Sequence, residues 1–491
     1  MPRATRSISS IDISMKGLLS VTALTGALAF VAIDQRKRKR SKETTSRALS
    51  YDRQEDLIGK TPLLRLEKLS RYLFEGSNRC SDGKGRGGRQ SFFVKMECSN
   101  PNGTGKDRAA LFMLQKAEET GQLPSPSRNS NHTEVLEKKV TTNIKHANDN
   151  DVTIEATIAQ AMLRTKTGGI IVEGTSGSTG ISLATLATQR GHSTIIVMPD
   201  DQAMEKQSIL HCLGAVVHVV PNAAISNPNH YVNVAKRIAM EINSRKIAFK
   251  DDLLLQAAFM NQFENAANYQ AHYSTTGPEI WNQTDGRVDL FCMSSGTGGT
   301  ISGCGQFLKN SCKRFNPQKP PCKIVLVDPP GSALYNKVKY NVAFASQQKE
   351  RSMKRHRYDT LAEGIGLDRI TYNFSLGADN GVIDDAIRVT DQEAVDIAHW
   401  LLREEGLFVG SSSAMNVIGA IRAVIDAREN NVEFHNVVTI ICDGGQRHLS
   451  RFWNREFIIK WGLKWPGDDL HEWINRLPPC LQEISRISNS N

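Results

Sequence analysis

The chain has 491 residues, of which 40% are hydrophobic and 23% charged, and these proportions suit one or two globular domains with a substantial core. The formal net charge is +10, but much of the surplus is local, because the run Arg36–Arg40 alone supplies five positive charges. No basic stripe interleaved with aromatic residues follows, so the composition argues against a nucleic-acid partner.

The nine cysteines are scattered along the chain, and none forms a Cys-x-x-Cys pair or a Cys/His set with zinc spacing. An odd count without a disulfide framework indicates reduced thiols in a cytosol-like compartment. We therefore expect neither a structural disulfide nor a metal site.

The first hydrophobic segment is Gly17–Ile33, a run without charges that is just long enough to span a bilayer as a helix. A cleaved signal is the alternative, because Ala27–Ala29 resembles a cleavage site. The basic run Arg36–Arg40 follows almost at once and favours retention with the body in the cytosol. We expect a single-pass anchor and basic linker over residues 1–50. The pattern is typical of the mitochondrial outer membrane, with the endoplasmic reticulum or the inner membrane as alternatives.

A globular body is expected over residues 51–465, followed by a tail over residues 466–491. Two insertions interrupt the body: a Gly-rich basic loop at residues 76–90 and a polar segment at residues 124–166, of which Thr153–Arg164 suits a helix.

A lysine follows a turn at the start of a predicted helix, and the arrangement is unusual. The sequence predicts a buried strand at Phe92–Met96, a turn at Asn100–Gly105 and a helix that begins near Lys106. A cation is disfavoured at a helix N-terminus, which suits an amine that forms an imine or faces an anion. Taken alone, a solvated lysine is the simpler interpretation.

From Gly169 onward, apolar runs suited to parallel strands alternate with helical stretches, which predicts α/β layers. The predicted strands are Ile170–Val172, Thr194–Met198, Ala215–Val220, Leu290–Met293, Ile324–Val327 and Val437–Ile441. The predicted helices include Ile181–Gln189, Ala203–Leu213, Tyr231–Asn243 and Asp391–Glu404.

Three loops after strands carry polar or glycine-rich sequence, at the edge where parallel sheets bind ligands. Glu173–Gly180 is rich in hydroxyls near a helix start and suits an anion such as a carboxylate. Ser294–Gly303 is rich in glycine, which lets backbone N–H groups cradle a phosphate. Gly406–Asn416 places serines where they can cap a helix or contact a ring nitrogen. Together with Lys106, these are the parts that a pyridoxal phosphate enzyme requires.

The order and spelling of these motifs resemble the cysteine synthase (O-acetylserine sulfhydrylase) and cystathionine β-synthase family, fold type II pyridoxal phosphate enzymes. The matching segments run from about Leu57 to Ser450 and are Ile58–Leu66, Asn100–Arg108, Thr175–Gly180, Met198–Pro199, Leu213–Ala215, Gln262–Asn268, Thr276–Trp281, Gly296–Thr300, Glu363–Gly366 and Glu405–Ser412. The resemblance implies an α/β, two-domain, tryptophan-synthase-β-like architecture, with a smaller domain at about 98–265 and a larger one at about 51–97 plus 266–465. A homodimer is expected by the same analogy.

The resemblance also implies roles for particular residues. Lys106 would hold the cofactor as a Schiff base and move the α-proton. The cofactor's phosphate would lie on Gly296, Thr297, Gly298, Gly299 and Thr300, and its ring nitrogen on Ser412, with Ser413 as a lesser candidate. The substrate carboxylate would be bound by Thr175, Ser176, Thr179 and Gln262, and Gly364 would lie in the loop that closes on the substrate. Ser178 replaces the family asparagine that contacts the cofactor's 3′-oxygen, and Leu367–Arg369 replaces the family's Gly-Phe pair.

The implied activity is that of a transferase of cysteine biosynthesis. Sulfide would replace the acetyl group of O-acetylserine through an aminoacrylate, giving L-cysteine and acetate. The alternatives are a cysteine desulfhydrase, a cystathionine β-synthase-type lyase, and a degenerate member that acts as an anchored binding protein. The intact Lys106 and Gly296–Thr300 argue against the last of these.

Overall fold

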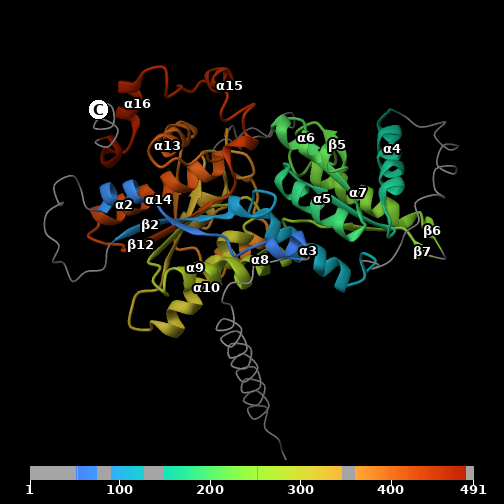
Figure 1. Ribbon diagram of the computed structural model, residues 1–491, viewed down its shortest axis with the longest axis horizontal. Helices are drawn as coiled ribbons and strands as arrows, with labels where there is room; N and C mark the ends of the chain where they lie inside the picture. Colours follow the sequence, from blue (N-terminus) through green and yellow to red (C-terminus); the bar gives the residue numbers. More distant parts are fainter. Residues whose placement is uncertain are drawn as a thin grey trace, which may run out of the picture. The chain divides into compact units, whose positions relative to one another are not determined.

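A computed structural model describes residues 51, 53–74, 90–125, 149–250, 253–344 and 360–482 (Figure 1). The predicted anchor at residues 17–33, the basic run, most of the loop at residues 76–90 and most of the first half of the 124–166 insertion lie outside these residues. Within the described part, every helix is too short or too polar to cross a bilayer. The helix predicted at Thr153–Arg164 is confirmed as part of α4 (Asp149–Arg164).

A four-stranded parallel sheet is built from residues 169–259. Its strand order is β5 (Val216–Val220), β4 (Ser193–Pro199), β3 (Gly169–Gly174) and β8 (Gln256–Phe259). The two central strands are buried along their whole length, as expected for a sheet covered on both faces. One face packs on α4 and α7 (Tyr231–Ser244), and the other on α3 (Lys106–Glu119), α5 (Ser178–Arg190) and α6 (Met204–Cys212).

A six-stranded mixed sheet is built from both ends of the body. Its strand order is β1 (Leu63–Arg65), β2 (Ser91–Met96), β12 (Asn436–Ile441), β9 (Leu290–Ser294), β10 (Lys323–Asp328) and β11 (Asp385–Arg388). All neighbours pair in parallel except the edge strand β1, which is antiparallel to β2. A parallel-rich α/β architecture is therefore confirmed. The two sheets occupy the residues expected for two domains, although the domain boundaries themselves stay a prediction.

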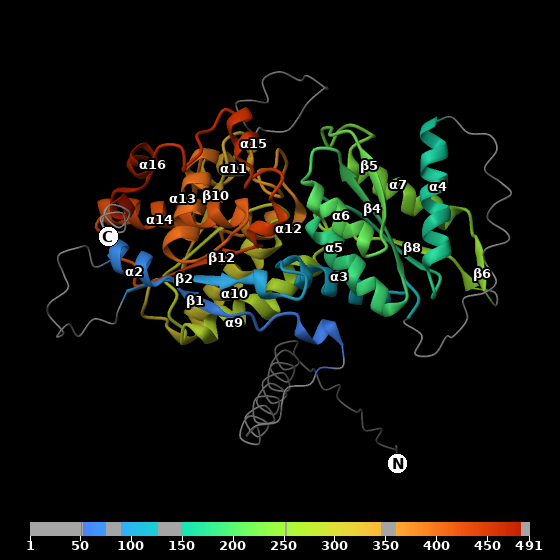
Figure 2. The same cartoon turned by 45° about the horizontal axis from the view of Figure 1, so that its top comes forward.

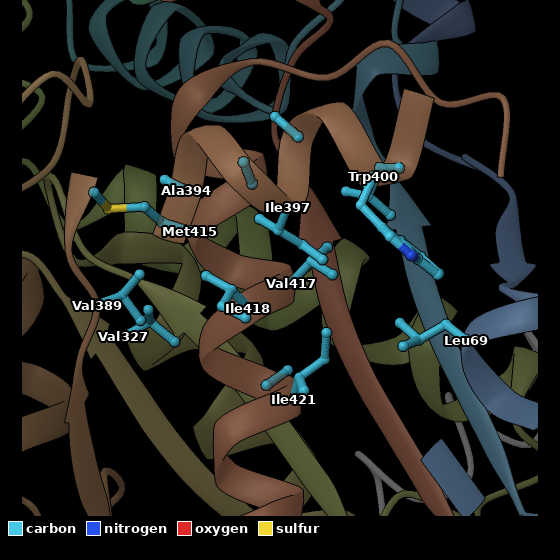
Figure 3. Close-up of a cluster of buried hydrophobic side chains, with 14 of the residues drawn as sticks. Leu69, Val327, Val389, Ala394, Ile397, Trp400, Met415, Val417, Ile418 and Ile421 are labelled. Atoms are coloured by element: carbon cyan, nitrogen blue, oxygen red, sulfur yellow. The ribbon is translucent and has the colours of Figure 1, made fainter. Parts of the chain in front are cut away.

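The larger hydrophobic cluster lies on one face of the six-stranded sheet. The helices on this face are α2 (Glu67–Phe74), α13 (Asp391–Glu404), α14 (Ser411–Glu429), α15 (Arg455–Lys460) and α16 (Leu470–Arg476). Figure 3 shows Ile397 and Trp400 of α13 beside Val417, Ile418 and Ile421 of α14. Burying such side chains supplies the main stabilising free energy, about 1.5–3 kcal/mol for each large apolar residue. Trp473 and Leu477 join this cluster, so the predicted tail contributes to the core.

The opposite face of the same sheet carries α9 (Gly277–Gln283), α10 (Gly299–Phe315), α11 (Leu334–Tyr340) and α12 (Tyr372–Ala378). The short helix α8 (Ala267–Ala271) contacts both α3 and α10 and so joins the layers of the two sheets (Figure 1). Figure 2 shows α3 beside the four-stranded sheet and α10 beside the six-stranded sheet. A small antiparallel pair, β6 (Ala248–Lys250) and β7 (Leu253–Leu254), completes the described strands.

Candidate active site

Lys106 is the first residue of α3, and two backbone contacts fix that end of the helix. The amide of Gly105 donates to the carbonyl of Cys442 at 3.2 Å, and Thr104 forms an isolated bridge with Asp443. Cys442 and Asp443 directly follow β12, so these contacts hold Lys106 at the carboxyl end of that central strand. This is the edge at which α/β sheets bind ligands.

The amine of Lys106 lies in an environment that favours its neutral form. Burial lowers the pKa of the Lys106 amine, and the nearby Cys442 and Asp443 oppose that shift only in part. No side chain in the described ranges forms a hydrogen bond or ion pair with this amine. A lysine with a lowered pKa is the form that acts as a nucleophile toward a carbonyl group.

The glycine-rich loop between β9 and α10 is packed so closely that no side chain fits. A Cβ atom on Gly296 would lie 2.0 Å from the carbonyl oxygen of Gly364, and one on Gly299 would lie 2.3 Å from Oδ1 of Asn268. Gly298 has a φ of +87°, and its Cβ would lie 2.4 Å from Cα of Phe374. Glycine is therefore required at all three positions.

This loop leaves donors available for a ligand. The first N–H groups of α10 have no intrahelical acceptor, as at any helix N-terminus. The hydroxyls of Ser294 and Ser295 are buried and lack a hydrogen-bond partner among the described residues. Glycines that admit close approach, free N–H groups and spare hydroxyls together fit a phosphate group.

Thr297 and Thr300 flank this cradle and are held by neighbouring side chains. Asn268 Nδ2 donates to Thr297 Oγ1 at 2.9 Å, and Thr371 Oγ1 donates to the Thr297 carbonyl at 2.7 Å. Thr300 Oγ1 lies 3.1 Å from His272 Nε2. Burial lowers the pKa of His272 to about 3, so this imidazole is neutral at physiological pH.

The hydroxyl-rich loop after β3 meets the segment that follows β8. Thr179 Oγ1 donates to Gln262 Oε1 at 2.6 Å, and Gln262 Nε2 donates to the carbonyl of Gly174 at 3.3 Å. Ser178 is the first residue of α5, which is tied to α3 because Ser182 Oγ donates to Asp107 Oδ1 at 2.5 Å. The two helix starts therefore bring Ser178 and Lys106 to the same cavity.

A single cavity collects nearly all of the residues predicted from the sequence. Those that line it are Lys106, Ser176, Ser178, Thr179, Gln262, Gly296, Thr297, Gly298, Thr300, Gly364 and Ser412. The predicted residues that do not line it are Thr175, whose hydroxyl accepts the Gly177 amide at 3.1 Å, and Gly299, which packs on Asn268.

The two serines at the start of α14 differ in their surroundings. Ser413 Oγ accepts the Cys442 amide at 2.9 Å and donates to the Asp443 carbonyl at 3.2 Å, so it fixes the end of β12. Ser412 lines the cavity instead. This difference supports Ser412, rather than Ser413, as the serine that faces a ligand.

The cavity also contains charged and imidazole groups that the sequence analysis did not assign. They are Glu97, Lys206, His230, His272, Glu363, Asp368 and Asp443. Asp443 follows the carboxyl end of β12, and that position is a usable signal. Lys206 and His230 carry no comparable signal, because an ordinary helix and a helix cap would look the same.

In the described ranges, no group of His, Cys, Asp and Glu is placed to hold a metal ion, and the cysteines are unpaired. Burial raises the pKa of Cys442, which lines the cavity, to about 11, so its thiol is protonated at neutral pH.

Similarity to known proteins identifies the family of this chain. Residues 151–443 match the family described as pyridoxal-phosphate dependent enzyme. A Saccharomyces cerevisiae protein provisionally named mitochondrial cysteine synthase is 39% identical, over 81% of this chain and 83% of its own length. Cysteine synthase 2 of Schizosaccharomyces pombe is 38% identical, over 83% of this chain and 84% of its own length.

More distant proteins share the same body. Mouse cystathionine beta-synthase is 30% identical over 83% of this chain, which corresponds to 56% of its own length. The crystal structure of O-ureido-L-serine synthase superposes with a TM-score of 0.56, covering 82% of this chain and 95% of that chain, at 23% identity. This last likeness concerns the fold alone.

Proposed function

The chain belongs to the pyridoxal-phosphate dependent enzymes and to their cysteine synthase branch, and we propose that it makes L-cysteine and acetate from O-acetyl-L-serine and sulfide. The observation that carries the proposal is the Lys106 amine, which shares one cavity with a phosphate-sized glycine cradle and with Thr179 and Gln262. The cysteine synthases of two yeasts match most of the chain and support the same activity.

The residues of the cradle fit pyridoxal phosphate, as the close approaches at Gly296 and Gly298 and the spare hydroxyls of Ser294 and Ser295 indicate. When bound, the cofactor supplies an electron sink for loss of the α-proton and of the β-substituent. We assign its phosphate to the segment Gly296–Thr300, its ring nitrogen to Ser412 and its 3′-oxygen to Ser178.

Lys106 has two tasks in this proposal. Its amine holds the cofactor covalently, and the same nitrogen takes the proton from the substrate's α-carbon once the substrate has displaced it. The lowered pKa that burial produces keeps this amine able to accept a proton.

The substrate carboxylate is assigned to the loop that contains Thr175, Ser176 and Thr179, together with Gln262. The bond from Thr179 Oγ1 to Gln262 Oε1 orients the Gln262 amide, whose Nε2 donates one hydrogen to the Gly174 carbonyl and keeps the other for the substrate carboxylate. The peptide group of Gly364 borders the opposite side of the substrate site. Its carbonyl oxygen lies close to Gly296, because a Cβ atom on Gly296 would be 2.0 Å from that oxygen.

The activity is tested on the purified full-length chain loaded with pyridoxal phosphate. O-acetylserine, serine and cysteine are supplied in turn, each with and without sulfide, while visible absorbance and products are followed. Cysteine formation from O-acetylserine and sulfide supports the proposal. Sulfide release from cysteine without synthesis would instead favour a desulfhydrase. Cystathionine formation from serine and homocysteine would favour the lyase, a candidate supported by the mouse relative. A protein that cannot take up the cofactor would indicate a binding protein.

We further propose that residues 17–33 anchor the enzyme in the mitochondrial outer membrane with the body in the cytosol, and that the body forms a homodimer. The uncharged run before Arg36–Arg40 supports the anchor, and the S. cerevisiae relative is named as mitochondrial. Alkaline carbonate extraction and protease treatment of isolated mitochondria test the first point, and sedimentation of the purified protein tests the second. Extraction of the protein into the carbonate supernatant would contradict an anchor.

A further inference from the structure

His230 ends the segment that connects β5 to α7, and its ring is held in one orientation. Its Nδ1 accepts the amide of Val232 at 3.1 Å and so caps the N-terminus of α7. The backbone is fixed as well, because the His230 amide donates to the Asn227 carbonyl at 3.0 Å. Because Nδ1 acts as an acceptor, the ring hydrogen is placed on Nε2.

The segment before His230 is also anchored. Asn233 Nδ2 donates to the carbonyls of Ile225 and Asn227 at 2.7 and 2.8 Å. The start of α7 lies against the end of β3, since a Cβ atom on Gly174 would lie 2.7 Å from Cα of Val232. His230 is therefore positioned next to the loop to which we assign the substrate carboxylate.

The His230 ring lines the cavity and is only 8% exposed. Burial, with a smaller contribution from Arg369, lowers its pKa to about 4, so the imidazole is neutral at physiological pH. In the described part of the chain, no acceptor forms a hydrogen bond with Nε2. This N–H group is therefore the hydrogen-bond donor that His230 offers to a ligand in the cavity.

The chemistry of the surrounding wall indicates what this donor meets. Ala223, Ala224 and Ile225 line the cavity from the same segment, and Ile365 lines it from the Gly364 loop. With the substrate's carboxylate on the β3 loop and its α-carbon near Lys106, the β-substituent is the part left to face this apolar wall. His230 is thus a neutral donor beside this apolar stretch of the wall.

We propose that the Nε2–H group of His230 donates a hydrogen bond to an oxygen of the departing acyl group and makes the site selective for β-substituents that carry such an oxygen. The inference rests on the proposed synthase function. In the step concerned, Lys106 takes the α-proton, the electron pair of the Cα–H bond forms the second bond between Cα and Cβ, and the bond between Cβ and the ester oxygen breaks with its electron pair leaving on acetate. The hydrogen bond stabilises negative charge as it develops on the acetate.

The test uses His230→Asn in the full-length holoenzyme. Asparagine is a good helix cap whose side-chain oxygen replaces Nδ1, while nothing replaces Nε2. The kcat/KM value for O-acetylserine is compared with that for β-chloro-L-alanine, which loses chloride in place of acetate. Loss of one hydrogen bond should lower the value for O-acetylserine about 10- to 100-fold. The value for chloroalanine should change less than about threefold, and acetate should become a weaker product inhibitor.

His211→Asn is the matched control, because it removes an exposed imidazole from α6 and should leave both values unchanged. Equal losses for the two donors, or no loss for either, would overturn the proposal and show that His230 is only a cap. The visible absorbance of bound cofactor and the melting temperature confirm that the variant is folded and loaded. If the unsubstituted enzyme makes cysteine from neither donor, the proposed synthase function fails instead, and the leaving-group role fails with it.

Discussion

Lys206 and Glu363 form a buried ion pair beside the cavity, with only 4% and 2% of their side chains exposed. Lys206 belongs to α6, which covers the four-stranded sheet, whereas Glu363 directly precedes Gly364. The Glu363 carboxylate also lies 3.2 Å from Nε of Arg451 and 3.8 Å from Nδ1 of His448. Burial alone would raise the pKa of Glu363, but the neighbouring basic groups, Lys206 first among them, outweigh burial and leave the pKa lowered.

The same lysine also supports the carboxylate loop. Gly177 has a φ of +126°, and a Cβ atom there would lie 2.8 Å from Cδ of Lys206. The aliphatic part of Lys206 therefore contacts the carboxylate loop at Gly177, and its amine pairs with Glu363 in the loop that contains Gly364. It is a positioning residue that connects the two.

Lys206→Met keeps the stem and removes the charge. Because breaking a buried pair leaves the carboxylate short of a partner, we expect the variant to lose about 3 kcal/mol in free energy of unfolding. The KM for O-acetylserine should rise about tenfold while the visible absorbance of bound cofactor stays. Urea denaturation and steady-state kinetics measure both. Lys236→Met, on the exposed face of α7, is the matched control, and equal behaviour of the two variants would refute this role.

Lys106→Ala tests the assignment on which the function depends. Without the amine, covalent attachment is lost and no group remains to move the α-proton, so turnover should fall about a thousandfold or more. The visible absorbance of the bound cofactor should disappear as well. Lys116→Ala removes an exposed lysine from the same helix and should leave both properties intact. A Lys106→Ala protein that keeps its colour and turnover would show that another residue holds the cofactor.

Much of the fold was predictable, because local signals and tertiary packing agree. Helix α13 begins at the predicted Asp391 because Thr390 and Glu393 form a capping box, a signal readable in the sequence. The fully buried strands β3 and β4 each contain a short apolar run, which the sequence shows directly. The short edge strands β1 and β11 are partly exposed and carry little apolar pattern, so periodicity does not reveal them.

The site was predictable where glycine or lysine is required by backbone geometry or chemistry, as at Gly298 and Lys106. It was not predictable where the function of a residue depends on a distant partner. Lys206 and Glu363 are 157 positions apart, and nothing near either residue indicates the pairing. His230 resembles any polar cap, and only the folded chain shows that this residue lines the cavity.

Ser412 and Ser413 are adjacent and chemically identical, yet we expect their alanine variants to differ. Ser413→Ala removes a hydroxyl that bonds three backbone groups just after β12, and should lower the free energy of unfolding by about 1–3 kcal/mol. Ser412→Ala should leave stability nearly unchanged but alter the visible absorbance of bound cofactor and lower kcat. Thermal denaturation and absorbance spectra distinguish the two. A spectral change in Ser413→Ala alone would reverse the assignment.

Glu173 is a buried carboxylic acid at the end of β3, and its Oε2 has no partner among the described residues. Burial raises its pKa from 4.5 to about 8, although the amides of Gln262 and Asn261 oppose that rise. The folded state therefore binds a proton that the unfolded state has lost. This contribution to stability is complete below pH 4.5 and is lost as the pH rises through about 8.

Glu173→Gln keeps the size of the side chain and removes its ionisation. The variant should match the unsubstituted protein near pH 4.5, where both groups are neutral, and should become the more stable of the two as the pH approaches 8. A melting temperature higher by about 2–5 °C at pH 8 is expected, because the burial cost of the charge is gone. Glu433→Gln, in the exposed loop before β12, should show no such dependence on pH. The opposite result would be a variant that, compared with the unsubstituted protein, loses stability between pH 5 and pH 8. Glu173 would then be ionised in the folded state, and a cation not identified in the structure would have to balance its charge.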